Sequence, residues 1–229
     1  MASSPDRDPR GPLQKSFLFG DGSDTATPVV LGPADAIVHR IRPPVKAHGG
    51  KYYLARQIVP ILLGVREKIT EYLEPCVFGG SVFLAMPRFQ REILGDINPN
   101  VVSLWTVLSD SRSAGELSDC LRDISYNRPT FEAAKQRDAA TIIEQTTRFL
   151  IRCRFSRGGL GKDFAWSERQ RGGRPGDENA WETFRDTELP KIVGRARGVE
   201  VTSEPCWWTV WPRWTPWSVA HNWNGRSRN

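Results

Sequence analysis

The chain has 229 residues, of which 39% are hydrophobic and 25% charged, a balance typical of a globular protein with one large domain or one domain with an insertion. No apolar run reaches the ~18 residues of a membrane helix, and the N-terminal sequence lacks the apolar core of a secretory signal. We therefore expect a cytoplasmic protein without a membrane segment.

The cysteines argue against a metal centre. Cys76, Cys120, Cys153 and Cys206 are far apart, form no CxxC pair and have no histidine at ligand spacing. A zinc site or a disulfide framework needs closely spaced ligands or partners. We expect buried or incidental thiols and no bound metal.

The positive charge is concentrated in one stretch of the chain. The net charge is +6, and Arg148 to Arg174 carries eight basic residues against Asp163 and Glu168 alone. Eight minus two is +6, so this stretch accounts for the whole excess. A local basic excess of this kind fits a nucleic-acid partner.

The first half of the chain predicts strands alternating with helices. Residues 1 to about 35 are rich in Pro, Gly, Ser and Asp, and we expect a disordered tail. Lys51 to Leu63 has apolar residues at helical spacing. Ile69 to Glu74 reads as a strand that enters a glycine turn, and Glu92 to Asp96 reads as a second strand.

The second half begins with a helix start at Asn98-Pro99, with Asn as the cap and Pro at the first helical position. Residues 109–152 predict helix, with Ile142, Phe149 and Cys153 on one face of the last segment. Residues 153–180 predict mostly loop, and Val199 to Val201 a third strand. Strands and helices in this order indicate parallel α/β units.

The last 23 residues, Trp207 to Asn229, differ from the rest. They hold six of the nine tryptophans and contain no Leu, Ile, Phe, Asp or Glu. One interpretation is a Trp-rich surface or partner-binding tail. The interpretation we favour is that the original reading frame was lost near Glu204, because nothing after it continues an α/β domain.

A possible anion site lies at the start of the first helix. Gly49 and Gly50 precede Lys51, and backbone amides followed by a lysine bind a carboxylate or a phosphate. A glycine turn before a solvated lysine has the same sequence, so this segment alone does not decide between the two.

The predicted strand ends carry acidic residues. Glu74 ends the first strand, and Gly79 and Gly80 follow in the turn, where missing Cβ atoms leave room for a ligand. Asp96 ends the second strand, where a carboxylate accepts hydrogen bonds from ribose hydroxyls or caps a helix. Ligands of open parallel sheets bind at such strand ends.

Taken in order, the segments GGK, EP-x-x-x-GG-x-VF and D-I-N resemble the Dam-type adenine-specific DNA methyltransferases over residues 42 to 202. The resemblance implies an α/β fold, with a partial Rossmann-like, S-adenosylmethionine-dependent methyltransferase sheet and an inserted, mostly helical DNA-recognition region. It assigns residues 36–108 to the N-terminal part of the cofactor-binding domain and 109–198 to the DNA-recognition region. Residues 199–229 are then the third strand and the Trp-rich tail.

The resemblance also assigns the cofactor contacts. In this family the GGK lysine and the residue four before it help to hold S-adenosylmethionine. The implied cofactor-binding residues are Ala47, Lys51, Glu74, Gly79, Gly80 and Asp96. The chain departs from the common EPF-x-G-G-G form, with Cys76 for Phe and Phe78 for the first Gly, and Ala47 replaces a common aromatic residue.

The basic stretch occupies the position of the family's DNA-recognition region, an Arg-bearing helix followed by a Gly-rich loop. The implied DNA-binding residues are Arg152, Arg154, Arg157, Lys162, Arg169 and Arg171. Arginines bind phosphates and read guanine edges, and the glycines from Gly158 to Gly161 let the loop lie close to a duplex. Phe155, Phe164 and Trp166 would pack or stack. The alternative is a solvated basic loop.

The family's catalytic Asp-Pro-Pro-Tyr motif is missing. The Pro-Pro pair of the chain, Pro43-Pro44, precedes the cofactor motif, and Glu204 to Trp207 resembles the motif only faintly. We expect no catalytic residue in this chain.

The resemblance implies an adenine-specific DNA methyltransferase, monomeric and acting on double-stranded DNA, that is inactive as this truncated chain. A non-catalytic DNA-binding module with a Trp-rich tail remains the alternative. A dinucleotide-dependent oxidoreductase is disfavoured because no G-x-G-x-x-G turn follows the first strand.

Overall fold

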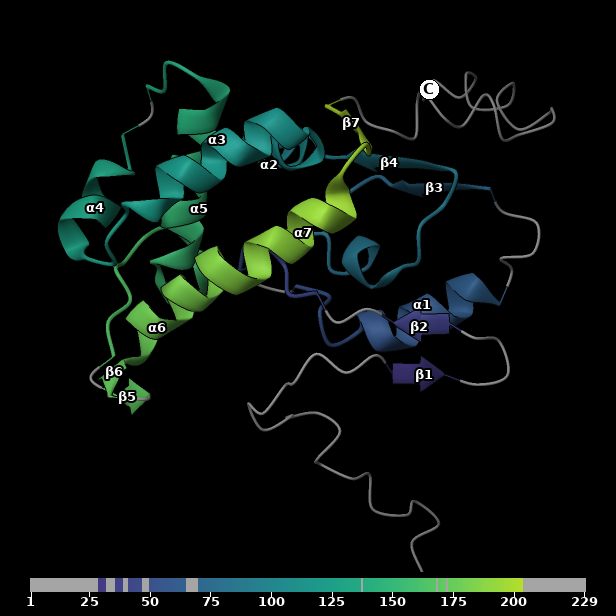
Figure 1. The fold of residues 1–229 in the computed structure, drawn as a ribbon, viewed down its shortest axis with the longest axis horizontal. Helices are drawn as coiled ribbons and strands as arrows, with labels where there is room; N and C mark the ends of the chain where they lie inside the picture. The colour runs from purple at the N-terminus through teal and green to yellow at the C-terminus, as the bar shows by residue number, and fades with distance from the viewer. Residues whose placement is uncertain are drawn as a thin grey trace, which may run out of the picture.

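The computed structural model (Figure 1) describes residues 29–31, 36–38, 41–46, 50–64, 70–136, 138–167, 169–171 and 173–203. Within these residues, a three-stranded parallel sheet has the order β3 (Glu71–Glu74), β4 (Arg91–Gly95) and β7 (Glu200–Thr202). The prediction of a parallel α/β arrangement is confirmed, and so is the third strand near residue 200.

The strand boundaries follow from local chemistry. β3 ends where Pro75 follows it, because a proline cannot donate to the ladder of a parallel sheet. β4 was expected at Glu92 to Asp96 but runs one residue earlier, so Asp96 stands just beyond the strand. The amide of Asp96 still donates to the carbonyl of Thr202 at 3.3 Å.

The helix α2 (Pro99–Ser109) confirms the predicted Asn-Pro start, since the Asn98 side chain accepts a hydrogen bond from the Asn100 amide at 3.0 Å. The predicted helix at Lys51 to Leu63 is shorter, α1 (Ala55–Leu63), and is preceded by a turn. β1 (Val29–Leu31) pairs antiparallel with β2 (Ala36–Val38). β1 therefore stands within the predicted tail, whose residues 1–28 and 32–35 lie outside the described ones.

The segment expected to be helical at 109–152 is divided into α3 (Ser111–Arg122), α4 (Arg128–Ala133) and α5 (Ile142–Arg154). Asp110, Asn127 and Thr141 cap their first turns, so each helix has its own start signal. Ile142, Phe149 and Cys153 all lie in α5, at spacings that put them on one face of the helix. Phe149 and Cys153 are buried, whereas Ile142, the first residue of α5, is 42% exposed.

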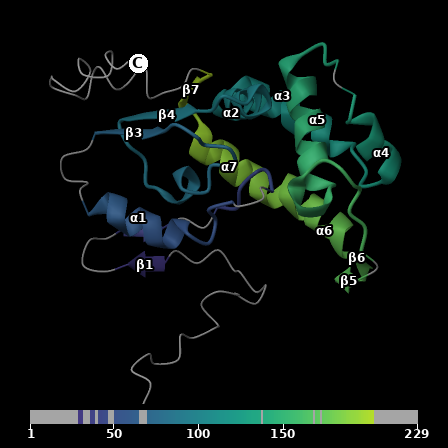
Figure 2. The same cartoon turned by 180° about the vertical axis from the view of Figure 1, so that it is seen from behind.

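The chain after α5 contains a 3-10 turn (Arg157–Gly159) and the short antiparallel strands β5 (Gln170–Arg171) and β6 (Arg174–Pro175). The loop expected up to residue 180 ends earlier, because α6 (Gly176–Thr183) has already begun. A π turn (Phe184–Glu188) then leads into α7 (Leu189–Ala196). Figures 1 and 2 show these elements as one rod that crosses from β5 and β6 to the sheet.

One buried apolar cluster underlies both the sheet and the helices, with members from Phe83 and Leu94 to Phe155 and Phe184. A buried ion pair joins the last helix to the sheet. The Arg195 guanidinium lies 2.7 and 2.8 Å from the two carboxylate oxygens of Glu92, and its centre lies 4.0 Å from the Phe83 ring centroid. The Trp-rich residues 207–229 lie outside the described part of the chain.

Candidate functional site

The ends of β3 and β4 lie side by side, because the strands are parallel and Glu74 pairs with Leu94. The turn after Glu74 folds across the end of β4. The Val77 amide donates to the Gly95 carbonyl at 3.0 Å, and the Phe78 amide donates to Asp96 Oδ2 at 3.0 Å. The structure therefore brings the glycine turn and Asp96 together, as the sequence predicted.

Glu74 is held in place from its own strand and from the following turn. Its Oε2 accepts hydrogen bonds from the Tyr72 hydroxyl at 2.8 Å and from the Phe83 amide at 2.9 Å. Tyr72 and Glu74 are two residues apart and so project from one face of the strand. Burial raises the pKa of Glu74 to about 7, although both hydrogen bonds and the charge of Lys51 lower it.

A hollow of about 430 Å³ opens at this end of β3, and we call it the strand-end hollow. Its walls are mostly apolar, with one cation and two glutamates. It is lined by Lys51, Ile58, Leu62, Glu71, Tyr72, Leu73, Glu74, Pro75, Cys76, Val82, Met86 and Phe89. Of the predicted cofactor residues, Lys51 and Glu74 thus face one cavity, whereas Gly79, Gly80 and Asp96 are not among its lining residues.

Asp96 accepts two backbone hydrogen bonds. Its Oδ1 accepts from the Asn98 amide at 2.9 Å, and its Oδ2 accepts from the Phe78 amide. A carboxylate oxygen has more than one lone pair, so each can accept a further hydrogen bond. Asp96 is therefore a turn-capping aspartate, one of the two roles that the sequence left open, and its contact with ribose hydroxyls stays a prediction.

The glycines of the turn make room for protein, and the room that they were expected to leave for a ligand stays a prediction. Gly80 has a φ of +65°, and a Cβ there would lie 2.4 Å from the Trp105 ring. A Cβ on Gly79 would lie 3.3 Å from the Val45 carbonyl oxygen. Trp105 fixes this turn further by donating from Nε1 to the Phe78 carbonyl at 2.8 Å.

Phe78 occupies the position of a family glycine in a backbone conformation that glycine favours. Its φ is +39°, which side chains with a Cβ rarely adopt. This departure of the chain from the family pattern thus stands at a left-handed position whose amide donates to Asp96. Lys51 is exposed in the turn before α1, and Ala47 lies outside the described residues.

Arg154 has an internal role. Its guanidinium donates to the Pro44 carbonyl at 2.7 Å and to the Pro43 carbonyl at 2.8 Å, and lies 3.7 Å from the centroid of the Phe184 ring. Burial lowers its pKa. All of these contacts anchor α5 to other parts of the protein, and the contact of Arg154 with DNA stays a prediction.

Arg152 lies at the edge of a polar hollow of about 540 Å³, lined by Asn100, Lys135, Arg152 and Gly161. Its guanidinium makes long contacts to Asn100 Oδ1 at 3.4 Å and to the Ala134 carbonyl at 3.5 Å. The sequence did not point to Asn100 or Lys135, since they lie on separate helical segments far from Arg152 in the chain. An arginine in a polar hollow can bind an anion.

The remaining basic residues of the predicted DNA surface are solvent-facing. Arg157, Lys162 and Arg169 are exposed, and the side chain of Arg171 lies outside what the structure describes. Gly159, with a φ of +76°, packs against the backbone of Lys46, where a Cβ would lie 2.3 Å from the carbonyl oxygen. Gly159 thus lets the basic loop pack against residues 43–46, the segment whose carbonyls also accept hydrogen bonds from Arg154.

Among the described residues, none of the helices combines the length and the apolar character needed to cross a membrane. The same residues contain no group of three or more His, Cys, Asp or Glu side chains arranged to hold a metal ion.

Comparison with known proteins places the strand-end site within a recognised family segment. A family model described as D12 class N6 adenine-specific DNA methyltransferase matches residues 48–156. The chain is 33% identical over 126 residues to the protein named DNA adenine methylase of Haemophilus influenzae, an alignment that covers 52% of this chain and 42% of that relative. The chain thus spans less than half the length of this relative. Residues 48–156 of this chain are thus similar to the D12 class of N6 adenine-specific DNA methyltransferases.

Proposed function

We propose that this chain carries the methyl-donor and DNA-binding elements of an adenine-specific DNA methyltransferase, with S-adenosylmethionine as the donor. The observation that carries the proposal is the junction of the Glu74 turn with Asp96 at neighbouring strand ends, inside the family segment. The proposal includes a Rossmann-like methyltransferase sheet with residues 109–198 as an inserted DNA-recognition region.

The strand-end hollow has the chemistry that this donor requires. S-adenosylmethionine supplies a methyl group on a positively charged sulfonium, and it also carries an amino acid and an adenosine moiety. The apolar walls suit the adenosine moiety of the donor. Lys51 would bind the carboxylate of the donor's amino acid, and Glu74 would face the donor's positive charge. Asp96 lies outside the lining of the hollow, at the end of the neighbouring strand β4, and would accept from the ribose hydroxyls there. The residues present therefore fit the donor.

The described residues supply no group that holds an adenine amino nitrogen in the manner of Asp-Pro-Pro-Tyr. The Pro43 and Pro44 carbonyls already accept hydrogen bonds from Arg154. We therefore propose that the chain binds donor and DNA without supporting turnover. This observation also favours the second candidate, a non-catalytic DNA-binding module, which differs in having no affinity for the donor.

The two candidates are separated by the reactivity of Cys76. Cys76 is exposed and lines the strand-end hollow, whereas Cys120 is exposed on α3. We expect saturating S-adenosylmethionine to slow alkylation of Cys76 by iodoacetamide and to leave Cys120 unchanged, as measured by peptide mass spectrometry. A Cys206→Ser background removes the thiol outside the described residues. Equal alkylation of Cys76 with and without S-adenosylmethionine would refute the donor site. The non-catalytic DNA-binding module would then be the remaining candidate.

A further inference from the structure

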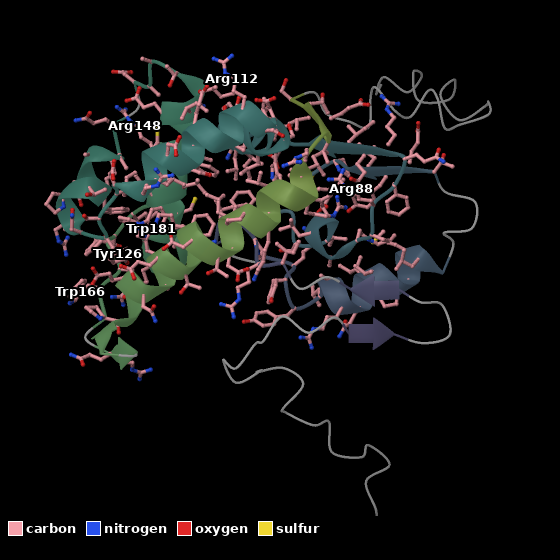
Figure 3. All side chains as sticks on the ribbon, in the orientation of Figure 1. Arg88, Arg112, Tyr126, Arg148, Trp166 and Trp181 are labelled. Atoms are coloured by element: carbon pink, nitrogen blue, oxygen red, sulfur yellow. The ribbon has the colours of Figure 1, made fainter. Side chains whose placement is uncertain are left out.

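A row of aromatic side chains leads from the core to the surface of the helical region, and we call it the aromatic column. The ring centroids of Trp181 and Phe155 lie 4.9 Å apart, and those of Phe155 and Tyr126 lie 4.3 Å apart. Tyr126 lies 5.2 Å from Phe164, and Phe164 stacks on Trp166 at 6.4 Å with an interplanar angle of 22°. Figure 3 shows Trp181, Tyr126 and Trp166 following one another toward the edge of the molecule.

The column is buried at one end and open at the other. Trp181 is 3% exposed and Tyr126 is 8% exposed, whereas Trp166 is 52% exposed. Hydrogen bonds hold the inner rings, since Trp181 Nε1 donates to the Ile124 carbonyl and the Tyr126 hydroxyl donates to the Ala165 carbonyl. The exposed indole therefore rests on a fixed support.

The loop that carries Trp166 is also fixed by its backbone. The Ala165 amide donates to the Phe155 carbonyl at 2.7 Å, and the Arg157 amide donates to the Asp163 carbonyl at 3.1 Å. Ser156, fully buried, accepts at its hydroxyl from the Gly161 amide at 2.8 Å. Because these bonds already order the loop, a ligand that contacts Trp166 would lose little further conformational entropy.

Cations lie near the exposed end of the column along the chain, and one of them, Arg128, lies near it in space. Arg157, Lys162 and Arg169 are exposed residues of the same loop region. The Arg128 guanidinium lies 5.4 Å from the centroid of the Phe164 ring. Phe164 is the ring of the column on which Trp166 stacks. Isolated exposed aromatic residues are common on protein surfaces. A rigid, exposed indole among cations instead matches a ligand with flat rings and negative charge.

We propose that Trp166 is a stacking platform for a nucleobase of DNA, with Arg157, Lys162 and Arg169 contacting the flanking phosphates. The proposal rests on the DNA-binding part of the proposed function and adds the residue that meets a base. Stacking on an aromatic side chain tolerates any base, because every base has a π face. Trp166 contributes affinity, and sequence preference arises elsewhere.

The test measures binding of the full chain to a fluorescein-labelled DNA duplex by anisotropy over a series of salt concentrations. Trp166→Ala should weaken binding about 5- to 100-fold at every salt concentration, the effect expected for one stacked base. The slope of log affinity against log salt should stay unchanged, because no phosphate contact is lost. Arg157→Ala should instead reduce that slope by about 1.

Two variants control for folding and for general surface effects. Trp166→Phe keeps a ring and should retain most of the affinity that Trp166→Ala loses. Ile61→Ala removes an apolar side chain that is more exposed than Trp166, on α1 at the far end of the molecule in Figure 1, and should bind as the unmodified chain does. Unchanged affinity of Trp166→Ala, a changed salt slope, or a loss that Trp166→Phe does not restore would each overturn the proposal.

The outcome is independent of the donor site. Protection of Cys76 should be the same in Trp166→Ala as in the unmodified chain. If S-adenosylmethionine protected Cys76 in neither protein, while Trp166→Ala still weakened DNA binding as expected, the methyltransferase proposal would fail. The proposal that Trp166 stacks on a base would stand. If the unmodified chain did not bind DNA, the stacking proposal for Trp166 would fail. The donor site would still be tested separately by the alkylation of Cys76.

Discussion

The carboxyl group of Glu74 is placed at the wall of an apolar hollow, where burial raises its pKa to about 7 from an ordinary value near 4.5. An acid with a raised folded-state pKa binds more protons in the folded chain than in the unfolded chain between these values. The free energy of unfolding therefore falls as pH rises from about 4.5 to about 7, and the loss is complete above that range.

We expect Glu74→Gln to remove this dependence. The amide oxygen can still accept from Tyr72 and the Phe83 amide, but it cannot ionise. The unmodified chain should lose up to about 3 kcal/mol of unfolding free energy between pH ~5 and ~8 relative to Glu74→Gln, measured by urea denaturation. Glu116→Gln, at an exposed position of α3, serves as the matched control. Equal pH profiles of Glu74→Gln and the unmodified chain would contradict this assignment.

The residue scale also shows where sequence patterns stop being informative. Glu74 and Asp96 could be predicted, because acidic residues at strand ends have a fixed relation to the edge of a parallel sheet. The role of Gly80 could not, because it depends on the Trp105 ring, which approaches from α2. Tyr72 was not predicted, although its spacing of two from Glu74 within a strand was a usable signal.

At the scale of elements, α5 and the loop that follows it pack against residues 43–46. Arg154 donates to the carbonyls of Pro43 and Pro44, and Gly159 lies against the backbone of Lys46. The sequence predicted α5 from its apolar periodicity, yet the partners of Arg154 lie 110 and 111 positions away in the chain. Such a contact depends on tertiary packing, which no local pattern encodes, and the internal contacts of Arg154 could therefore not be predicted.

Arg154→Ala should accordingly reduce stability. It removes two charge-assisted hydrogen bonds and a cation–π contact and leaves the Pro43 and Pro44 carbonyls without this donor, so we expect a loss of about 2 to 4 kcal/mol in urea denaturation. Arg157→Ala, three residues further on and exposed, should change stability by less than about 0.5 kcal/mol. Equal stability of the two variants would show that the contacts of Arg154 do not hold α5 in place.

At the scale of the whole molecule, one apolar cluster supports both proposed sites. The rod of α6, the π turn and α7 reaches from the helical region to the sheet, where Arg195 pairs with Glu92 (Figure 1). Trp181 at one end of this rod belongs to the aromatic column, and Arg195 at the other end packs on Phe83, which follows the Glu74 turn. The strand-end hollow and Trp166 are therefore held in a fixed relation.

A fixed relation between donor and DNA sites does not by itself give methyl transfer. The adenine must leave the duplex, and its amino group must be held near the methyl group by polar acceptors. The Dam-type resemblance assigns these acceptors to Asp-Pro-Pro-Tyr, a sequence that this chain does not contain. The carbonyls of its Pro-Pro pair, Pro43-Pro44, each accept a hydrogen bond from Arg154, which holds them in an internal contact.

We therefore expect no turnover by the full chain. In an assay with S-adenosylmethionine carrying a labelled methyl group and mixed-sequence duplex DNA, incorporation should equal that of a reaction without protein. The DNA adenine methylase of Haemophilus influenzae, assayed in parallel, provides the positive control. Cys76 protection and DNA binding should persist in the same preparation, which separates missing chemistry from a misfolded sample. Incorporation above the background would contradict this prediction and would mean that other residues of this chain hold the adenine.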